Sequence, residues 1–324
     1  MTMQPVIIGG GSWGCAIASA LMRAGQNIHL LVRSQKTVDA LAAGHCLQLP
    51  DVPSMQSMPA SLMPACLQTA NMIFVVVPVA ANPDAFASIA AHTRSGVPVI
   101  LCAKGITSHD EDNAQLLTHA AKHALPDHPV AVFSGPSFAD EVLAGLPAAL
   151  VAASTSPDVL EMIQSAFRHS NIRVYTNNDP DGLALAGAMK NVVAIAAGCA
   201  VGLGIGDNAK AAIITRGLAE IARLNHAIGG DAETVFGLGG VGDLALSCAG
   251  PHSRNMAFGL ALGAGETLPD KLAEGSRTVA GLAHLGRRMQ VDLPITNAID
   301  MVLNHGQNLN DAVKALLARR PGTE

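Results

Sequence analysis

A glycine-rich turn directly after the first apolar run constrains the fold of this chain more than any other feature. Residues Pro5–Ile8 form a short apolar run, and the segment GGGSWG at residues 9–14 follows before an alanine-rich stretch of helical character. This G-x-G-x-x-G pattern between a predicted strand and a predicted helix is the context in which it binds a dinucleotide. Gly9 permits the tight turn, Gly11 lets the backbone approach a pyrophosphate, and Gly14 allows close packing of the helix on the strand. The helix N-terminus adds free N–H groups and a positive dipole, whereas a purely structural glycine turn is the alternative.

The end of the second predicted strand, Ile28–Val32, bears on which dinucleotide is preferred. NAD-specific folds place Asp or Glu here to hold the ribose 2′-hydroxyl, but this chain has Arg33 followed by Ser34. A guanidinium group can pair with a 2′-phosphate, so we predict that NADP(H) is preferred and that NAD(H) is possible. A solvated arginine at the end of a strand is the alternative interpretation.

Alternation of short apolar runs with helical stretches in the first half predicts a parallel α/β sheet. The candidate strands lie between turn residues and are Pro5–Ile8, Ile28–Val32, Ile73–Val77, Val97–Cys102, Val130–Phe133, Ala149–Ala152 and Arg173–Tyr175. Several are apolar throughout, as expected of strands covered on both faces. We therefore predict an α/β protein: an N-terminal Rossmann-like parallel-sheet domain, residues 1–178, followed by an all-helical C-terminal domain, residues 179–324.

The second half shows helical periodicity and almost no alternation after Asn177-Asn178-Asp179-Pro180. A helix capped by Asp207 or Asn208 is expected to run to about Ile228 and to end at Gly229-Gly230. Further helices are expected to begin near Ser253, near Pro294 and at Asn310-Asp311. The apolar stretch Val192–Gly206 is 15 residues long and glycine-rich, which predicts a buried helix and no membrane span.

Composition excludes several classes of function. The net charge is −5 and the basic residues are scattered, which argues against nucleic acid and a membrane surface as partners. The six cysteines contain no C-x-x-C pair, which indicates reduced, buried thiols in a cytoplasmic protein without a signal peptide. His119 and His123 share a helix face but lack a third ligand, so no metal site is predicted.

Two polar residues interrupt segments that are otherwise apolar. Lys104 follows the predicted strand Val97–Cys102, and the carboxyl ends of parallel strands form the ligand edge of such a sheet. Lys190, with Asn191 beside it, lies in the apolar helical segment 185–197. Burying a lysine lowers its pKa and suits it to proton transfer near neutral pH. An ordinary surface lysine at position 104 and a snorkelling lysine at position 190 are the alternatives.

A third polar cluster follows the glycine-rich segment 239–242. Asp243 can orient a lysine ammonium or accept a hydroxyl proton, or it can simply form a turn. Ser253 is a candidate N-cap, which places Arg254 and Asn255 in a first helical turn where N–H groups and the helix dipole favour a phosphate.

These residues in this order resemble the NAD(P)-dependent glycerol-3-phosphate dehydrogenases of bacterial type over nearly the whole chain. The segments that carry the resemblance are 9–14, Ala103–Ile106, Gly135–Val142, Lys190–Ala194, Ile214–Glu220, Gly242–Leu244 and Gly250–Asn255. The chain departs from the family after Val77-Pro78, where Val79-Ala80-Ala81 stands in place of Ser and, shortly after, Arg. Ser247 stands where the family often has Thr.

The resemblance implies a role for most of the candidate residues. Beyond the glycines Gly9, Gly11 and Gly14, the implied cofactor contacts are Ser12, Trp13, Arg33, Lys104, Ala139, Arg254 and Glu274. The expected substrate contacts are Lys104, Gly135, Ser137, Lys190, Asn191, Asp243, Ser253, Arg254 and Asn255. Lys190 is implied as the catalytic acid/base, with Lys104 expected to stabilise negative charge and Asp243 to orient Lys190.

The implied reaction interconverts dihydroxyacetone phosphate and sn-glycerol 3-phosphate with NAD(P)H and supplies glycerol phosphate for phospholipid synthesis. The resemblance also suggests a homodimer. One alternative is another NAD(P)-dependent dehydrogenase, acting on a hydroxy acid or on another small phosphorylated substrate. A non-catalytic NADP sensor is a second alternative, because a fold by itself does not establish a function.

Overall fold

The protein is described here from a computed structural model, which covers residues 3–52, 55–107, 114–269 and 273–318. The described residues form two compact units. The first contains those up to Ala103 together with Leu117–Leu183. The second contains those between Lys104 and Leu116 together with those from Ala184 onward.

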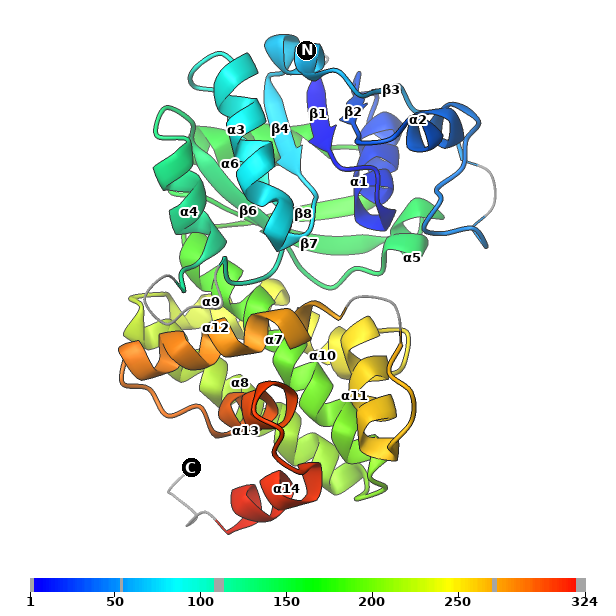
Figure 1. Cartoon of the computed structure of the whole chain (residues 1–324). Helices are drawn as coiled ribbons and strands as arrows, with labels where there is room; N and C mark the ends of the chain where they lie inside the picture. Colours follow the sequence, from blue (N-terminus) through cyan, green and yellow to red (C-terminus); the bar gives the residue numbers. More distant parts are fainter. Residues whose placement is uncertain (1–2, 53–54, 108–113, 270–272, 319–324) are drawn as a thin grey trace. The chain divides into compact units, whose positions relative to one another are not determined.

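An eight-stranded sheet organises the first unit (Figure 1). Its strands are β1 (Pro5–Ile8), β2 (His29–Leu31), β3 (Ala60–Ser61), β4 (Met72–Val75), β5 (Val99–Leu101), β6 (Val130–Ser134), β7 (Ala148–Ala153) and β8 (Ile172–Asn177). Their order is β3-β2-β1-β4-β5-β6-β7-β8. Strand order therefore reverses at β1, which creates the switch point beside which such sheets bind ligands.

The predicted α/β class with a Rossmann-like sheet is confirmed, but one strand pairing and one short strand were not foreseen. The two-residue strand β3 was not predicted. Strand β7 runs antiparallel to β6, whereas β1, β2, β4, β5 and β6 are mutually parallel. Residues 135–147 connect β6 to β7, and the helix in this connection is the five-residue α5 (Ala139–Leu143). At 1.5 Å per residue this helix spans roughly 7.5 Å, less than the roughly 17 Å of a five-residue strand, so the helix by itself does not return the chain to the start of β6 as a crossover helix would.

Both faces of the sheet are buried, in agreement with the apolar strands. Ile7 packs into one cluster with α1 (Ser12–Arg23), α2 (Gln35–Ala42), α5 and α6 (Pro157–Ala166). Its neighbours Val6 and Ile8 pack into a second cluster with the helical turn η1 (Pro64–Thr69), α3 (Asn82–His92) and α4 (Leu117–Ala124). A second short turn, η2 (Val79–Ala81), precedes α3. Successive side chains of a strand point to opposite faces, so one apolar run supplies both layers.

Helices build the second unit around α7, and from residue 180 onward helices are the regular elements that the structure describes. They are α7 (Pro180–Gly202), α8 (Asp207–Ala227), α9 (Ala232–Phe236), the π-helical turn η3 (Leu238–Gly242), α10 (Asp243–Cys248), α11 (Arg254–Ala264), α12 (Glu274–Arg288), α13 (Pro294–Asn304) and α14 (Leu309–Leu317). The segment from Lys104 to Leu116 joins this unit, where Ile106 and Leu116 form an isolated antiparallel bridge.

Helix α7 is longer than the apolar stretch predicted from the sequence. It has 23 residues and begins at Pro180, so its length and mean hydropathy of 1.6 alone would allow it to cross a membrane. Within the fold, however, 94% of its most apolar window is buried. This burial is that of a core helix, as predicted. The argument that the apolar stretch is too short to cross a membrane was wrong, because the helix is longer than that stretch.

The predicted helix boundaries hold to within a few residues. Ser253 is the N-cap of α11 and accepts a hydrogen bond from the Met256 N–H. Helix α8 ends one residue before Ile228, and Gly229 adopts a left-handed φ of 83°. Its N-cap is Gly206, not Asp207 or Asn208, because a φ of 90° at that turn suits glycine.

Paired glycines bring α7 and α11 into backbone contact. A Cβ on Gly198 would lie 2.3 Å from the Met256 carbonyl oxygen, and a Cβ on Gly259 would lie 2.0 Å from the Ile195 carbonyl oxygen. Gly202 and Gly263 repeat the arrangement one turn later. The glycines that interrupt the apolar stretch of α7 therefore serve helix packing.

Candidate functional site

The glycine loop has the geometry that dinucleotide binding requires. Gly9 has a φ of 117°, and a Cβ there would lie 2.4 Å from the Val76 carbonyl oxygen. A Cβ on Gly14 would lie 2.0 Å from the Gly9 carbonyl oxygen, so α1 packs directly on the turn. At Gly11 no atom lies within 4 Å of the Cβ position. The first and third glycines are thus needed by the protein, and the space at Gly11 is open to a ligand.

The start of α1 offers amide groups to an anion. Its first backbone hydrogen bond runs from the Cys15 N–H to the Gly11 carbonyl oxygen, so the helical N–H groups of Ser12, Trp13 and Gly14 precede the hydrogen-bonded ladder. The first turn contains no acidic residue that would repel a phosphate. The loop therefore fits the pyrophosphate of a dinucleotide.

Arg33 is exposed and lies two residues beyond β2. Ser34 is the N-cap of α2 and accepts a hydrogen bond from the Thr37 N–H, which fixes the backbone next to the arginine. The guanidinium is accessible to a 2′-phosphate, but its exposure equally suits a solvated side chain, so its role stays a prediction.

Three more predicted residues follow β6 in the first unit. Gly135 has a φ of 143°, and a Cβ there would approach the Ala149 carbonyl oxygen to 3.2 Å. The Ser137 hydroxyl donates to the Gly135 carbonyl oxygen at 3.1 Å. Ala139 is the first residue of α5. Since β1 and β6 belong to the parallel part of the sheet, their carboxyl ends share one edge, as predicted.

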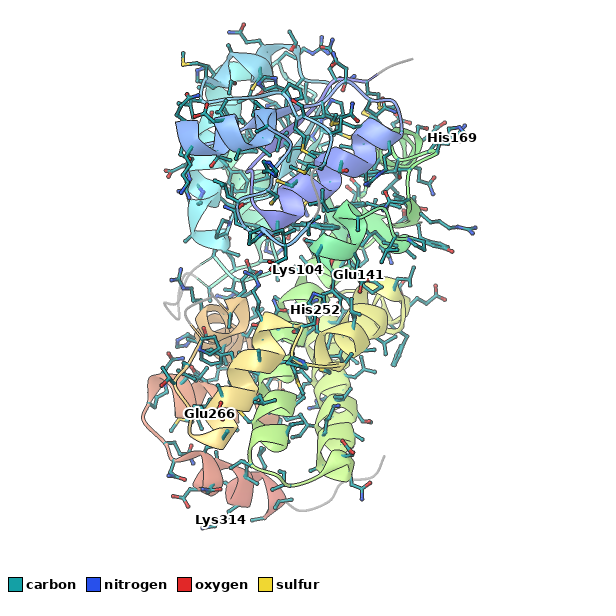
Figure 2. All side chains as sticks on the ribbon, turned by 90° about the vertical axis from the view of Figure 1, so that its right-hand side faces the viewer. Lys104, Glu141, His169, His252, Glu266 and Lys314 are labelled. Carbon is teal, nitrogen blue, oxygen red and sulfur yellow. The ribbon has the colours of Figure 1, made fainter. Side chains whose placement is uncertain are left out.

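The second unit gathers the predicted catalytic residues into one cluster, in which Lys190 and Asp243 are buried. Asp243, at the start of α10, is 2% exposed and lies between two lysines. The Lys104 Nζ is 2.7 Å from Asp243 Oδ2, and the Lys190 Nζ donates to Asp243 Oδ1. Lys190 also donates to the Ser247 hydroxyl oxygen at 2.7 Å. Lys104 keeps a 20% exposed side chain, labelled in Figure 2, whereas Lys190 is buried at 6%.

The charges of this cluster shift its protonation equilibria. Burial lowers the pKa of Lys190 to about 8; Asp243 opposes that shift, and Lys104 adds to it. Burial favours the neutral form of Asp243, but the positive charges of Lys104 and Lys190 outweigh it and lower the pKa of the carboxyl group. The cluster therefore combines a permanent carboxylate with a lysine that can exchange a proton near neutral pH.

Two sequence interpretations change here. The burial of Lys190 looked costly because its own helix contains no carboxylate, but Asp243, 53 residues further along the chain, supplies the partner. Asp243 is not in a glycine turn; it begins α10 directly after the π-helical turn η3. Ser247 was noted only as a family substitution. Ser247 lies four residues after Asp243, which puts both side chains on one helix face. This spacing could have predicted that Ser247 belongs to the same cluster as Asp243.

Asparagines extend the cluster toward the start of α12. The Asn255 Nδ2 donates to Asn191 Oδ1 at 3.0 Å, and Asn255 Oδ1 accepts from the Gly275 N–H at 3.0 Å. These bonds fix the orientation of the Asn255 amide. Burial raises the pKa of Glu274, next to Gly275, and the charge of Arg254 opposes the shift, followed by those of the two cluster lysines. Arg254 itself is exposed, at the start of α11.

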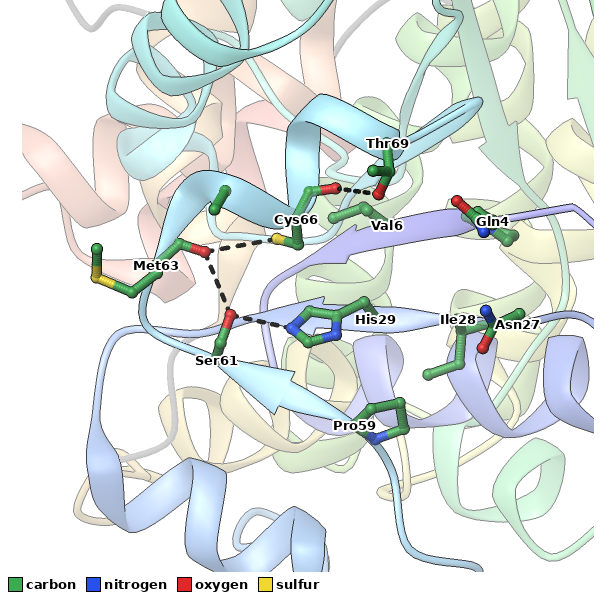
Figure 3. Close-up of a pocket in the computed structure, with 12 residues that line it drawn as sticks. Gln4, Val6, Asn27, Ile28, His29, Pro59, Ser61, Met63, Cys66 and Thr69 are labelled. Atoms are coloured by element: carbon green, nitrogen blue, oxygen red, sulfur yellow. Dashed lines mark hydrogen bonds between the residues drawn. The ribbon is translucent and has the colours of Figure 1, made fainter.

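A separate cavity of about 430 Å³ lies in the first unit at the amino ends of β1 and β2 (Figure 3). His29 and Ser61 are hydrogen-bonded at 2.9 Å in it. Cys66, which also lines it, is partly exposed, in contrast to the five other cysteines, so the expectation that all six thiols are buried was wrong for this one. Its described lining residues include none of the predicted site residues. The described part of the chain contains no group of three or more His, Cys, Asp or Glu side chains arranged to hold a metal ion.

Comparison with known proteins shows to which dehydrogenase family the chain belongs. The profile of the NAD-dependent glycerol-3-phosphate dehydrogenase N-terminus matches residues 5–160, and that of the C-terminus matches residues 179–314. The chain belongs to the NAD-dependent glycerol-3-phosphate dehydrogenase family. The family resemblance of the sequence is thereby confirmed.

Individual relatives match over almost their whole length. Glycerol-3-phosphate dehydrogenase [NAD(P)+] from Mesorhizobium japonicum is 39% identical over 98% of this chain and 93% of its own. The enzyme of the same name from Thioalkalivibrio sulfidiphilus is 40% identical over 98% of both chains.

Solved structures agree with these matches. The crystal structure of glycerol-3-phosphate dehydrogenase from Coxiella burnetii is 34% identical, with a TM-score of 0.91 over 98% of this chain and 99% of that one. The yeast enzyme, at 22% identity and a TM-score of 0.83 over 97% of this chain and 99% of its own, shares the fold.

Proposed function

We propose that this chain is an NAD(P)-dependent oxidoreductase that reversibly reduces dihydroxyacetone phosphate to sn-glycerol 3-phosphate, for use in phospholipid synthesis. The observation that carries the proposal is the Lys104–Asp243–Lys190 cluster in a chain of this family. A carbonyl reduction needs a hydride donor and a proton donor. The glycine loop fits the coenzyme that brings the hydride. The pKa of Lys190, lowered to about 8, suits this side chain to donate the proton.

The reaction divides between the coenzyme and this chain's side chains. When bound, NAD(P)H supplies the hydride that reduces C2 of the substrate. Lys190 donates a proton to the carbonyl oxygen, and in the oxidation direction its neutral form accepts the hydroxyl proton. Lys104 stabilises the negative charge that develops on that oxygen. Asp243 orients Lys190 through the hydrogen bond between them, and the Ser247 hydroxyl holds the same ammonium from a second direction.

Phosphate recognition is proposed for the start of α11. Ser253, Arg254 and Asn255 stand at its N-terminus, where the helix dipole and the guanidinium favour an anion. Holding the phosphate positions C2 for reaction. Asn191, which accepts a hydrogen bond from Asn255, is the remaining proposed contact of this unit. Gly135 and Ser137 are proposed as substrate contacts from the first unit.

Coenzyme recognition is proposed for Gly9, Gly11, Ser12, Trp13, Gly14, Arg33, Lys104, Ala139, Arg254 and Glu274. The presence of Arg33 and the absence of an acidic residue at the end of β2 support a preference for NADPH, with NADH accepted. We also propose that residues 1–178 form the dinucleotide-binding domain, that residues 179–324 form the substrate and dimerisation domain of a homodimer, and that the protein is cytoplasmic.

One assay tests the activity. Dihydroxyacetone phosphate is added to the purified protein with NADPH, and the loss of NADPH absorbance is followed, with NADH in a parallel sample. Oxidation that depends on the substrate is expected, and it is expected to be faster with NADPH. Binding of NADPH without turnover would contradict the proposal and favour another phosphorylated substrate or a non-catalytic sensor.

A further inference from the structure

One segment of the second unit carries Lys104. This segment, Lys104–Leu116, belongs to the helical unit, although the chain on either side of it belongs to the first unit. Its two described stretches, residues 104–107 and 114–116, pair with each other. Ile106 and Leu116 form the antiparallel bridge, and the Thr107 N–H and hydroxyl donate to the Gln115 carbonyl oxygen at 3.1 and 3.3 Å. A displacement of the second stretch is therefore passed to the first, in which Lys104 lies.

Arg288, the last residue of α12, binds the second stretch of this segment. Its Nη2 donates to the Ala114 carbonyl oxygen at 2.6 Å. Ala114 is fully buried and packs in the same core cluster as Ile106 and Leu116. A buried carbonyl group that loses a hydrogen bond loses part of what offsets its desolvation, so the guanidinium stabilises the segment in this position.

The other end of the segment meets the catalytic cluster. The Lys104 Nζ lies 2.7 Å from Asp243 Oδ2. A lysine side chain has a flexible four-carbon stem, so the position of its ammonium group depends on a fixed backbone as well as on the ion pair. The contacts thus connect Arg288, at the end of α12, with Lys104 through the paired backbone of the segment.

We propose that Arg288 is a positioning residue for the reaction, which holds the segment at Ala114 and thereby keeps Lys104 beside Asp243 and Lys190. Arg288 acts through the backbone of the segment, and the ammonium group of Lys104 is what acts in the cluster. This inference rests on the proposed function, in which Lys104 stabilises the charge that develops on the substrate oxygen.

The pH dependence of the reaction reports where Lys104 lies. Burial is the main cause of the lowered pKa of Lys190; Asp243 opposes it, and the charge of Lys104 adds to it. If Lys104 moves away, the charged form of Lys190 becomes more favourable and its pKa rises. Reduction needs protonated Lys190, so its kcat should then fall at a higher pH. The other titratable groups coupled to Lys190 lie on helices outside the segment and are Asp243 and Cys248 of α10 and Glu274 of α12.

Four variants of the full-length chain test the proposal. Arg288→Met removes the hydrogen-bond donor but keeps most of the side chain, and Arg288→Lys keeps a charged donor. Arg223→Met is the matched control, because Arg223 is also exposed and its Nη2 donates to a backbone carbonyl oxygen of the same unit, that of Asp292, at 3.0 Å. Lys104→Met gives the full effect of losing the Lys104 charge. Circular dichroism checks that each variant folds.

Initial rates of dihydroxyacetone phosphate reduction are measured from pH 6 to 10. For Arg288→Met, kcat should fall by about three- to tenfold, the effect of one hydrogen bond at an exposed side chain. The midpoint of its pH profile should move to higher pH, toward that of Lys104→Met and not beyond it. Arg288→Lys should restore most of both, and Arg223→Met should change neither. An unmoved midpoint in Arg288→Met would overturn the proposal.

A double variant separates positioning from general stabilisation. If Arg288 acts through Lys104, adding Arg288→Met to Lys104→Met should change neither kcat nor the midpoint any further. If the two losses in kcat multiply instead, Arg288 acts independently of Lys104 and the proposal is wrong.

Amide hydrogen exchange tests the same link without turnover. The Thr107 N–H, which bonds to Gln115, should exchange faster in Arg288→Met than in the wild type or in Arg223→Met, because the segment opens more often. Equal exchange in an active enzyme would overturn this proposal alone. If the wild-type protein did not reduce dihydroxyacetone phosphate, the proposed function would fail and the role of Lys104 with it, whatever the exchange at Thr107.

Discussion

The two proposed ligand regions of this protein are built from different chemical groups. In the first unit the glycine loop offers backbone amides and open space at Gly11, whereas a Cβ on Gly9 or Gly14 would collide with a backbone carbonyl oxygen. In the second unit Lys104, Lys190 and Asp243 offer charged side chains, two of them buried and all held by hydrogen bonds. The difference agrees with the two proposed roles. Backbone shape in the first unit suits the binding of a large coenzyme, and side-chain charge in the second unit suits proton transfer.

The largest expected effect is on Lys190 in the second unit. Lys190→Ala removes the proton donor, and kcat for reduction should fall by roughly 10²–10⁴-fold, the usual contribution of general acid catalysis. Coenzyme affinity should change little, because the glycine loop is untouched. Lys190→Met, which keeps most of the side-chain volume, and the exposed Lys314→Ala serve as controls for folding and for charge, with circular dichroism as the check. A kcat near that of the wild type would refute the role of Lys190.

The loop glycines provide the matching test in the first unit. Gly14→Ala should destabilise the free protein by about 1–3 kcal/mol, because its Cβ would collide with the Gly9 carbonyl oxygen. Gly11→Ala should change the free energy of unfolding by less than ~0.5 kcal/mol, since the space around it is open. It should nevertheless weaken coenzyme binding by about tenfold or more. Urea unfolding and NADPH titration separate the two effects, and equal unfolding energies for the two variants would contradict the distinction.

A substitution of Arg33 tests whether a charged side chain of the first unit contributes to coenzyme binding. If its guanidinium pairs with the 2′-phosphate, Arg33→Ala should reduce the ratio of kcat/KM for NADPH over NADH by about tenfold. The change should lie in KM and not in kcat, since the residue is predicted to bind only the coenzyme. The solvated alternative predicts an unchanged ratio.

The smallest predicted effect is a change in pH dependence. Because Lys190 has a pKa of about 8 and must be protonated to donate, kcat for reduction should fall as pH rises through about 8. The oxidation rate, which needs neutral Lys190, should rise over the same range. Asp243→Asn removes the carboxylate that favours the charged lysine, so both profiles should move to lower pH. Initial rates from pH 6 to 10 give the profiles; identical midpoints in the two proteins would show that Asp243 does not control Lys190.

Much of the site could be read from local sequence, because its motifs are tied to local backbone geometry. The glycine turn lies between a strand and a helix that are adjacent in the chain, and Ser253 caps the helix that it directly precedes. Both motifs can therefore be recognised from neighbouring residues alone. Lys190 could be recognised as unusual from its apolar neighbours, but not explained, since the carboxylate that holds it belongs to another helix.

The sequence by itself determined most of the strands and helices, the glycine loop and the identity of the polar residues, because periodicity and turn chemistry act over a few residues. Tertiary structure alone decided that β7 runs antiparallel, that Lys104 joins the helical unit, and that Asp243 lies between the two lysines. It also decided that glycines 198 and 259 bring two helices into contact. These features depend on contacts between residues that are far apart in the chain. The length of the connections, the volume of the side chains and the pairing of charges determine such contacts together, and only when the core forms.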